Sequence, residues 1–208
     1  MTQPAVNNVL SVADAITSRR SVRKYTNDQV SQADLKTILE LTGKAPSAWN
    51  IQPWRFVAVR NQEVKDKLQA AAYGQGQVGS APVVIAVYSD TTDALANLAD
   101  VIHPGVPAEQ RQGAIDGVLG AFAHRSQEEK EAWGLGQTNI ALGYLSLVAR
   151  SLGYDTSLML GFDPAQVKEI LGLPAHVQLA GLVSLGVAAE EGYPHHRHEV
   201  EKITQFID

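Results

Sequence analysis

Residues 128–152 read EEKEAWGLGQTNIALGYLSLVARSL, the longest segment of helical character in the chain. Gly153 follows it, and glycine is common just after the end of a helix. Apolar side chains lie on most of the helix circumference: Leu135, Ile140, Leu142, Tyr144, Leu145, Leu147, Val148 and Leu152. A helix that is apolar on nearly all sides must be buried on most of them. We therefore expect a central helix, or one that packs against a second copy of the chain.

The segments around this helix predict a mixture of helices and strands. Ser31 with Asp34 three residues later resembles a capping box that opens a helix, and Gly43 suits its end. Further helices are expected over 12–18, 62–73, 94–101, 108–123 and 163–171, and strands over 54–60, 81–88 and 177–187. The glycine-rich residues 74–79 are expected to open the second of these strands rather than a helix. Helix and strand do not alternate regularly, so the order favours an α+β domain over a doubly wound parallel sheet. We expect a single domain over residues 1–208.

Composition excludes several classes of site and partner. The chain has no cysteine, which rules out disulfides, thiolate metal sites and cysteine nucleophiles. No apolar run reaches the roughly 18–20 residues that span a bilayer, and Met1–Leu10 does not read as a signal peptide. The net charge of −5 argues against a general nucleic-acid binder. We expect a cytoplasmic protein with neither a nucleic-acid nor a membrane partner.

A cationic motif interrupts this acidic chain at residues 19–25, RRSVRKY. Residues 1–60 hold eight Lys/Arg against four Asp/Glu, whereas residues 61–208 hold nine against eighteen. Concentrated positive charge of this kind suits a small, highly charged anion, and guanidinium groups match the oxygens of a phosphate. The competing interpretation is a solvated helix end, because cations stabilise a helix C-terminus.

A second motif, APSAWNIQPW at residues 45–54, is rich in side-chain hydrogen-bonding groups. Ser47, Asn50 and Gln52 can bond to a polyol or to the edge of a heterocycle. The alternative is that these side chains satisfy the backbone of a turn while Trp49 and Trp54 fill the core.

Together the two motifs resemble the FMN-dependent nitroreductase family. The order of residues 152–156, LGYDT, and of Gly161-Phe162-Asp163 after them adds to the resemblance, which runs from Ala15 to about Ile203. It implies a three-layer α+β fold with a central mixed, mostly antiparallel sheet flanked by helices. The long helix would then lie buried at a dimer interface. Residues 90–127 would be a variable helical insertion.

The resemblance also implies which residues bind the cofactor. Arg19, Ser21 and Arg23 match positions that hold the FMN phosphate, with Arg20 as a neighbouring cation and Arg197 as a C-terminal one. The second motif would reach the flavin from the other subunit. Gln77, with Gln75 as the alternative, would face the ribityl chain or pyrimidine, and residues 158–161 would pass beside the isoalloxazine. The full set of residues implied is Arg19, Arg20, Ser21, Arg23, Pro46, Ser47, Ala48, Asn50, Gln52, Gln77, Leu158, Leu160, Gly161 and Arg197.

The chain departs from the family pattern at two of these positions. Many nitroreductases have Glu where this chain has Leu160, and some have Lys where it has Gln77. A cation near the pyrimidine of a flavin favours the anionic reduced form, because opposite charge stabilises an ionised group. Arg23 is the remaining candidate for that role. The differences concern the redox potential and the preferred acceptor more than FMN binding.

The activity that the resemblance implies is an NAD(P)H-dependent FMN oxidoreductase acting as a homodimer. It would reduce nitroaromatics, quinones or similar electron-poor acceptors by a ping-pong, two-electron hydride mechanism. The flavin would carry the chemistry, so no catalytic side chain is expected. Two alternatives remain: another flavin reaction, such as reductive dehalogenation or dehydrogenation, and a non-catalytic FMN-binding or regulatory protein.

Three histidines, His195, His196 and His198, lie close together near the C-terminus. A histidine-rich tract is only compositional evidence for a metal, and no metal site is expected here. A surface or packing role competes with help at the phosphate or at the dimer contact.

Overall fold

The computed structural model describes residues 9–207, so residues 1–8 and 208 of the expected domain lie outside it. Its centre is a sheet of four strands, β1 (Trp54–Val59), β2 (Val83–Ser89), β3 (Asp155–Met159) and β4 (Gln178–Gly186). The strands lie in the order β1-β2-β4-β3, and every neighbouring pair is antiparallel. A parallel contact comes from the isolated bridge between Ser21 and Thr156, outside the named strands.

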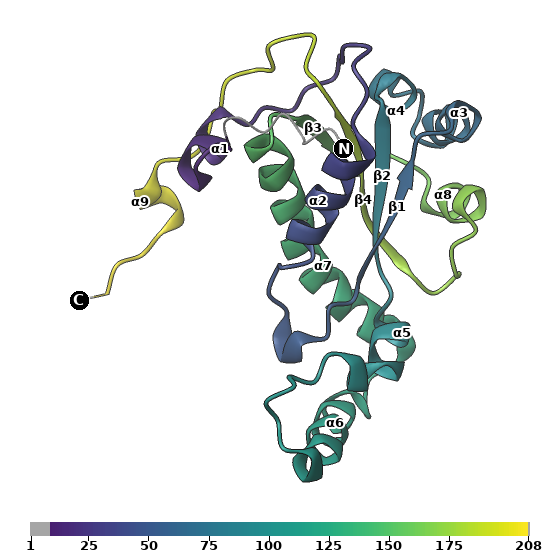
Figure 1. The fold of residues 1–208 in the computed structure, drawn as a ribbon, viewed down its shortest axis with the longest axis vertical. Helices are drawn as coiled ribbons and strands as arrows, with labels where there is room; N and C mark the ends of the chain where they lie inside the picture. Colours follow the sequence, from purple (N-terminus) through teal and green to yellow (C-terminus); the bar gives the residue numbers. More distant parts are fainter. Residues whose placement is uncertain (1–8, 208) are drawn as a thin grey trace.

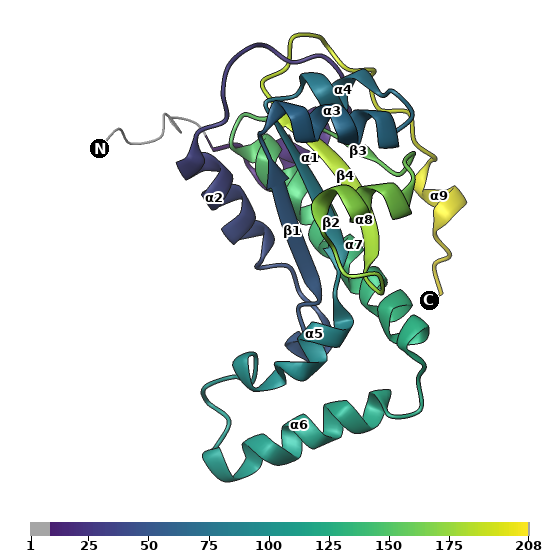
Figure 2. The same ribbon diagram turned by 90° about the vertical axis from the view of Figure 1, so that its right-hand side faces the viewer.

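Helices cover both faces of the sheet (Figures 1 and 2). On one face lie α2 (Gln32–Thr42) and α7 (Gln127–Ser151), with α1 (Val12–Ser18) packed on α7. The other face carries α3 (Gln62–Ala71), α4 (Gly76–Ser80) and α8 (Pro164–Leu171). A separate apolar cluster fills the space on each side, because alternate strand residues point to opposite faces. The expected three-layer α+β fold is confirmed.

Local sequence signals explain where several helices begin and end. The Ser31 hydroxyl accepts a hydrogen bond from the Asp34 backbone N–H at the start of α2. Ser126 and Glu129 form a reciprocal capping box at the start of α7. Asp163 caps α8 with Pro164 at its first turn, and Gly172 ends it in the left-handed conformation.

The long helix α7 is buried against the sheet on one side and exposed on the other. Leu145 and Ala149 are fully buried in the core, whereas Ile140 and Tyr144 are 39% and 40% exposed. The expectation of a central helix is confirmed, and packing against a second copy of the chain stays a prediction. The helix is central to the fold, and it also leaves an apolar outer face.

Residues 91–126 form a helical excursion that stands away from the sheet (Figure 2). It contains α5 (Thr91–Ala96), the 3-10 turn η2 (Leu98–Asp100) and α6 (Ala108–Phe122). Its small core includes Leu98, Val118 and Phe122. Within residues 9–207, no helix combines the length and the apolarity needed to cross a bilayer.

One local prediction is wrong. The glycine-rich residues 74–79 were expected to lead directly into a strand, but α4 forms at Gly76–Ser80 before β2 begins. Val78 and Gly79 are buried in this short helix, so packing against the rest of the fold outweighs the low helix propensity of glycine.

Candidate functional site

The cationic motif is held in place by the edge of the sheet. α1 ends at Ser18, and the chain then runs beside β3, where the Val22 backbone N–H donates to the Thr156 carbonyl at 3.1 Å. The Val22 side chain is buried, and the Tyr25 hydroxyl contacts the Ser184 hydroxyl at 2.7 Å. These two anchors fix the intervening backbone and leave Arg23 exposed to solvent.

A cavity of about 190 Å³ lies beside this segment and is called the cation pocket here. Its lining residues are Arg19, Arg20, Ser21, Arg23, Tyr193, Pro194, His195 and Arg197. Among residues 9–207, no carboxylate forms an ion pair with any of the four arginines. Burial, followed by the charges of Arg197 and Arg20, lowers the pKa of Arg19. The pocket therefore has an excess of positive charge that an anion would stabilise.

Arg20 has a second role at the end of α1. Its Nη1 donates to the carbonyls of Thr17 and Arg19, at 2.7 and 2.9 Å. Cations that bond to the last carbonyls of a helix stabilise its C-terminus. The helix-end interpretation thus applies to Arg20, while Arg19 and Arg23 make no such contact with α1.

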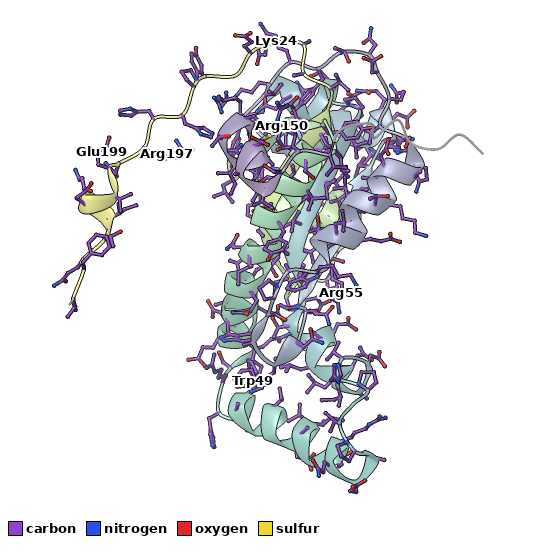
Figure 3. All side chains as sticks on the ribbon, turned by 60° about the vertical axis from the view of Figure 1, so that its left-hand side comes forward. Lys24, Trp49, Arg55, Arg150, Arg197 and Glu199 are labelled. Carbon is purple, nitrogen blue, oxygen red and sulfur yellow. The ribbon has the colours of Figure 1, made fainter. Side chains whose placement is uncertain are left out.

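The C-terminal arm, residues 188–207, brings Arg197 to the pocket. Ala189 N–H donates to the Lys24 carbonyl at 2.9 Å, and Lys24 pairs with Glu190 at 3.6 Å. At Gly192 an added Cβ would lie 2.5 Å from the Arg20 Cβ, so glycine is required for the close approach of arm and motif. Beyond the pocket the arm, with α9 (Val200–Ile203), extends away from the body of the molecule (Figures 1 and 3).

The second motif forms a tightly bonded loop around η1 (Ala48–Asn50). Trp49, Asn50 and Gln52 have φ angles of 52°, 57° and 50°, in the left-handed region that is costly for residues other than glycine. Hydrogen bonds hold this backbone: Ala48 N–H donates to Gln137 Oε1 at 2.9 Å, and Gln52 N–H donates to Ser47 Oγ at 3.0 Å. Trp49 also packs against the rings of Phe122 and Trp133.

The loop and the cation pocket are far apart in one chain. Figure 3 shows Trp49 near α6, at one end of the long axis, whereas Arg150 and Arg197 lie toward the other end. The structure therefore brings Arg19, Ser21, Arg23 and Arg197 together but leaves Pro46, Ser47, Ala48, Asn50 and Gln52 outside the pocket.

A third group of expected residues lies where β3 ends. Gln75 Nε2 donates to the Gly161 carbonyl at 2.6 Å, and Gln77 Nε2 donates to Gln75 Oε1 at 3.2 Å. Gln77 is buried, whereas Leu160 is 76% exposed and Leu158 is 38% exposed. Gln75, the alternative to Gln77 in the sequence analysis, is therefore the glutamine that contacts Gly161 directly.

A polar cluster formed by Asp90, Glu131 and His176, called the α5 cluster here, is not predicted from the sequence. Glu131 accepts hydrogen bonds of 2.9 Å from the backbone N–H groups of Thr91 and Thr92. Asp90 Oδ1 accepts from the Asp93 backbone N–H at 2.9 Å and contacts His176 Nε2 at 3.1 Å.

The three side chains of the α5 cluster offer potential metal ligands within 4.8 Å of one another. Both carboxylates, however, already bond to the first N–H groups of α5, which explains the cluster structurally. The three histidines of the C-terminal arm belong to no comparable group of ligands among the described residues.

Comparisons with known proteins show which family this chain resembles. A family model described as "Nitroreductase family" matches residues 16–187. A protein named NADH dehydrogenase from Thermus thermophilus is 49% identical over 195 residues, which cover 94% of this chain and 95% of that protein. An oxygen-insensitive NADPH nitroreductase from Helicobacter pylori is 27% identical over 196 residues, covering 91% and 93%.

A solved nitroreductase structure is also similar to this chain. The FMN complex of a nitroreductase homologue from Exiguobacterium sibiricum superposes with a TM-score of 0.89 at 29% identity. The match covers 98% of this chain and 100% of the homologue.

Proposed function

The chain belongs to the nitroreductase family, and we propose that it is an FMN-dependent oxidoreductase that takes electrons from NADH or NADPH. The observation that carries the proposal is the cation pocket, where four arginines with no carboxylate partner among the described residues surround one cavity. The named donor is NADH for the Thermus relative and NADPH for the Helicobacter relative. Both donors are therefore candidates.

The donor set fits the terminal phosphate of FMN. Arg19, Arg23 and Arg197 supply guanidinium groups, and Ser21 supplies a hydroxyl beside them. Guanidinium forks match phosphate oxygens in geometry and charge. Burial is the main cause of the lowered pKa of Arg19, and repulsion from Arg197 and Arg20 adds to it. A bound dianion would offset that repulsion.

When bound, FMN supplies the chemistry, by accepting a hydride from NAD(P)H and passing two electrons to an acceptor. The chain's own residues bind the cofactor and orient it. The arginines of the cation pocket hold the phosphate, and Gln75 fixes the Gly161 turn through its 2.6 Å hydrogen bond. The exposed Leu160 side chain supplies apolar surface next to that turn. We propose nitroaromatics, quinones or similar electron-poor compounds as acceptors, and the cytoplasm, where NAD(P)H is available, as the location.

We further propose that two copies of the chain build each flavin site. A flavin whose phosphate occupies the cation pocket would meet the Ser47–Asn50 loop only from a second copy, because the two lie toward opposite ends of one chain (Figure 3). The outer face of α7 exposes Ile140 and Tyr144. Beside it, an apolar groove of about 410 Å³ lies between α1 and α7.

We propose that the C-terminal arm contributes to the same contact between two copies. Its apolar side chains Ile203, Phe206 and Ile207 are exposed in the single chain. Light scattering coupled to size exclusion should therefore give twice the 22.4 kDa mass of one chain. A charged substitution on the outer face of α7, Tyr144→Arg, should shift the protein toward the monomer and weaken FMN binding. A stable monomer that binds FMN fully would contradict the two-copy site.

The proposed activity is tested on the purified protein. It should be yellow, with absorption at about 450 nm that bleaches when NADH or NADPH is added without oxygen. Adding a nitroaromatic or a quinone should restore the colour, with the reduced product formed in equal amount. Product analysis with halogenated substrates separates dehalogenation from nitro reduction.

Two outcomes would contradict the proposal. A colourless protein that also fails to bind added FMN would show that FMN is not its cofactor. Tight FMN binding with negligible NADH and NADPH turnover would instead support a regulatory flavin-binding protein.

A further inference from the structure

The loop around η1, residues 47–52 and called the η1 loop here, keeps an unfavourable backbone conformation. Asn50 and Gln52 have φ angles of 57° and 50°, which residues other than glycine hold only where their surroundings impose them. A bond from α7 and the aromatic contacts of Trp49 restrain the first half of the loop. The Gln52 N–H bond to Ser47 Oγ lies within the loop itself. The second half of the loop therefore needs an anchor elsewhere in the fold.

Arg55, near the start of β1, supplies this anchor. Its Nη1 donates to the Gln52 carbonyl at 3.0 Å and to the Trp54 carbonyl at 2.9 Å. Its Nη2 donates to the Asp93 carboxylate in the first turn of α5. Arg55 and Trp49 lie toward the same end of the molecule (Figure 3). One planar guanidinium thus joins the carbonyl of a left-handed residue to the helical excursion.

Asn50 makes a second connection between the η1 loop and the excursion. Its Nδ2 donates to the Val101 carbonyl, just after η2, at 3.0 Å, and its Oδ1 accepts from Gln52 Nε2 at 3.1 Å. A carbonyl can only accept, so the contact with Val101 defines which way the Asn50 amide points. A cavity of about 190 Å³ lies between this part of the loop and the excursion. Polar bonds therefore connect the two segments where close packing does not.

We propose that Arg55 and Asp93 are positioning residues for the cofactor. By tying the η1 loop to the excursion, they keep Gln52 in its left-handed conformation, and the loop is already shaped to meet the flavin of a second copy. A preformed loop loses less conformational entropy on binding than a mobile one. Asp93, which belongs neither to the cation pocket nor to the α5 cluster, thereby raises the affinity for FMN. This role rests on the proposed function, in which the loop meets the flavin.

The first measurement is a fluorescence titration of FMN into the full-length protein, freed of flavin. Arg55→Gln should weaken FMN binding about tenfold, because it removes the bridge between the Gln52 carbonyl and Asp93. Asp93→Asn keeps an acceptor oxygen opposite Arg55 and should weaken binding only about twofold.

The second measurement is hydrogen exchange in the same flavin-free proteins, which reports on the η1 loop without any bound cofactor. Backbone amides of residues 47–52 should exchange about tenfold faster in Arg55→Gln than in wild type, since exchange follows local opening. A side chain that acts only by touching FMN would leave this exchange unchanged.

Gln52→Gly distinguishes positioning from direct contact with the cofactor. Glycine adopts positive φ about as readily as negative φ, so the left-handed conformation stays populated without the bridge. Arg55→Gln should therefore weaken FMN binding about twofold when Gln52→Gly is already present, against about tenfold when it is absent. An Arg55 that contacts FMN itself would produce the same loss in both backgrounds.

Arg60→Gln is the matched control for a general loss of stability. Arg60 is exposed just beyond the other end of β1, and its Nη2 donates to the Val30 carbonyl at 2.8 Å. Its replacement also removes a bond from an arginine to a backbone carbonyl, but away from the η1 loop. FMN affinity and the exchange of residues 47–52 should stay at their wild-type values.

Four results would overturn the inference: wild-type FMN affinity in Arg55→Gln, unchanged exchange of residues 47–52 in that variant, an equal loss with and without Gln52→Gly, or an equal loss in Arg60→Gln. In each case the wild-type protein binds FMN, so the proposed function stands. Failure of the wild-type protein to bind FMN would instead refute both.

Discussion

The cation pocket and the α5 cluster are both groups of charged side chains, but their charges are used differently. In the α5 cluster, Glu131 and Asp90 bond to the N-terminal N–H groups of α5 and to His176. In the pocket, the guanidinium groups of Arg19, Arg23 and Arg197 form no ion pair with a carboxylate within residues 9–207, although the Arg23 backbone N–H donates to Glu190. Charge satisfied inside the chain stabilises the fold, whereas several cations that line one cavity without a counterion favour an anionic ligand.

This contrast predicts that substitutions in the two regions affect different quantities. Removing a charge from the α5 cluster should lower the free energy of unfolding and leave FMN binding nearly unchanged. Removing a charge from the cation pocket should weaken FMN binding and leave the free energy of unfolding nearly unchanged.

The largest expected effect is on stability. Glu131→Ala leaves the buried Thr91 N–H without its acceptor, together with the N–H and hydroxyl groups of the exposed Thr92. The free energy of unfolding should fall by about 3 kcal/mol, measured by urea denaturation. Glu131→Gln, which keeps an acceptor oxygen, should lose less. Glu169→Ala, at an exposed position on α8, is the control and should change little. A small effect of Glu131→Ala would mean that the α5 cluster does not hold the fold.

The next effect is on binding. Arg19→Gln should weaken FMN binding about 30-fold, equivalent to about 2 kcal/mol, because it removes a charge-assisted contact to the phosphate. The stability of the flavin-free protein should stay the same or rise slightly, since repulsion from Arg197 and Arg20 is relieved. Fluorescence titration with FMN measures the first quantity and urea denaturation the second. Lys36→Gln, on the exposed face of α2, is the control. An Arg19→Gln protein that is less stable than wild type but binds FMN with wild-type affinity would contradict this prediction.

The smallest effect concerns alkaline pH. Burial and the hydrogen bond to Asp34 raise the pKa of Tyr154 to about 12 from an ordinary value of 10.0. The folded chain thus favours the protonated phenol, and this contribution is complete below pH 10 and is lost as the pH rises toward 12. Tyr154→Phe should cost about 1 kcal/mol at pH 8, and the difference from wild type should shrink by pH 11.5. A difference that stays constant with pH would show that the phenol proton does not contribute.

Much of the fold follows from local patterns in the sequence. The capping residues Ser31 and Asp163 and the apolar run of β2 specify their elements through contacts a few residues away. The order of the strands does not, because the pairing of β2 with β4 depends on packing between residues far apart in the chain. The short helix at Gly76–Ser80 was missed for the same reason.

The candidate site likewise combines features that local sequence predicts with features that depend on contacts between distant residues. Arg19, Ser21 and Arg23 are neighbours in sequence, so their shared cavity could be anticipated, and Arg197 joined them only through the resemblance to a family. The turn of Arg20 toward the end of α1 depends on side-chain geometry that the motif does not contain. Glu131 gave no signal, because one acidic residue in a long helix reads as part of a solvated face. The contact between Gln137 and Ala48 joins segments 89 positions apart.

The bridges Ser21–Thr156 and Tyr25–Ala188 join an early segment of the chain to late ones. During synthesis the motif at residues 19–25 leaves the ribosome long before its partners on β3 and after β4 exist. Contacts between such distant segments form late and slowly, because the chain between them must first be ordered. A growing chain therefore cannot assemble the pocket before residues 188–197 have been made. Cofactor capture becomes a late step, and a chain truncated before Ala188 would be unable to retain its flavin.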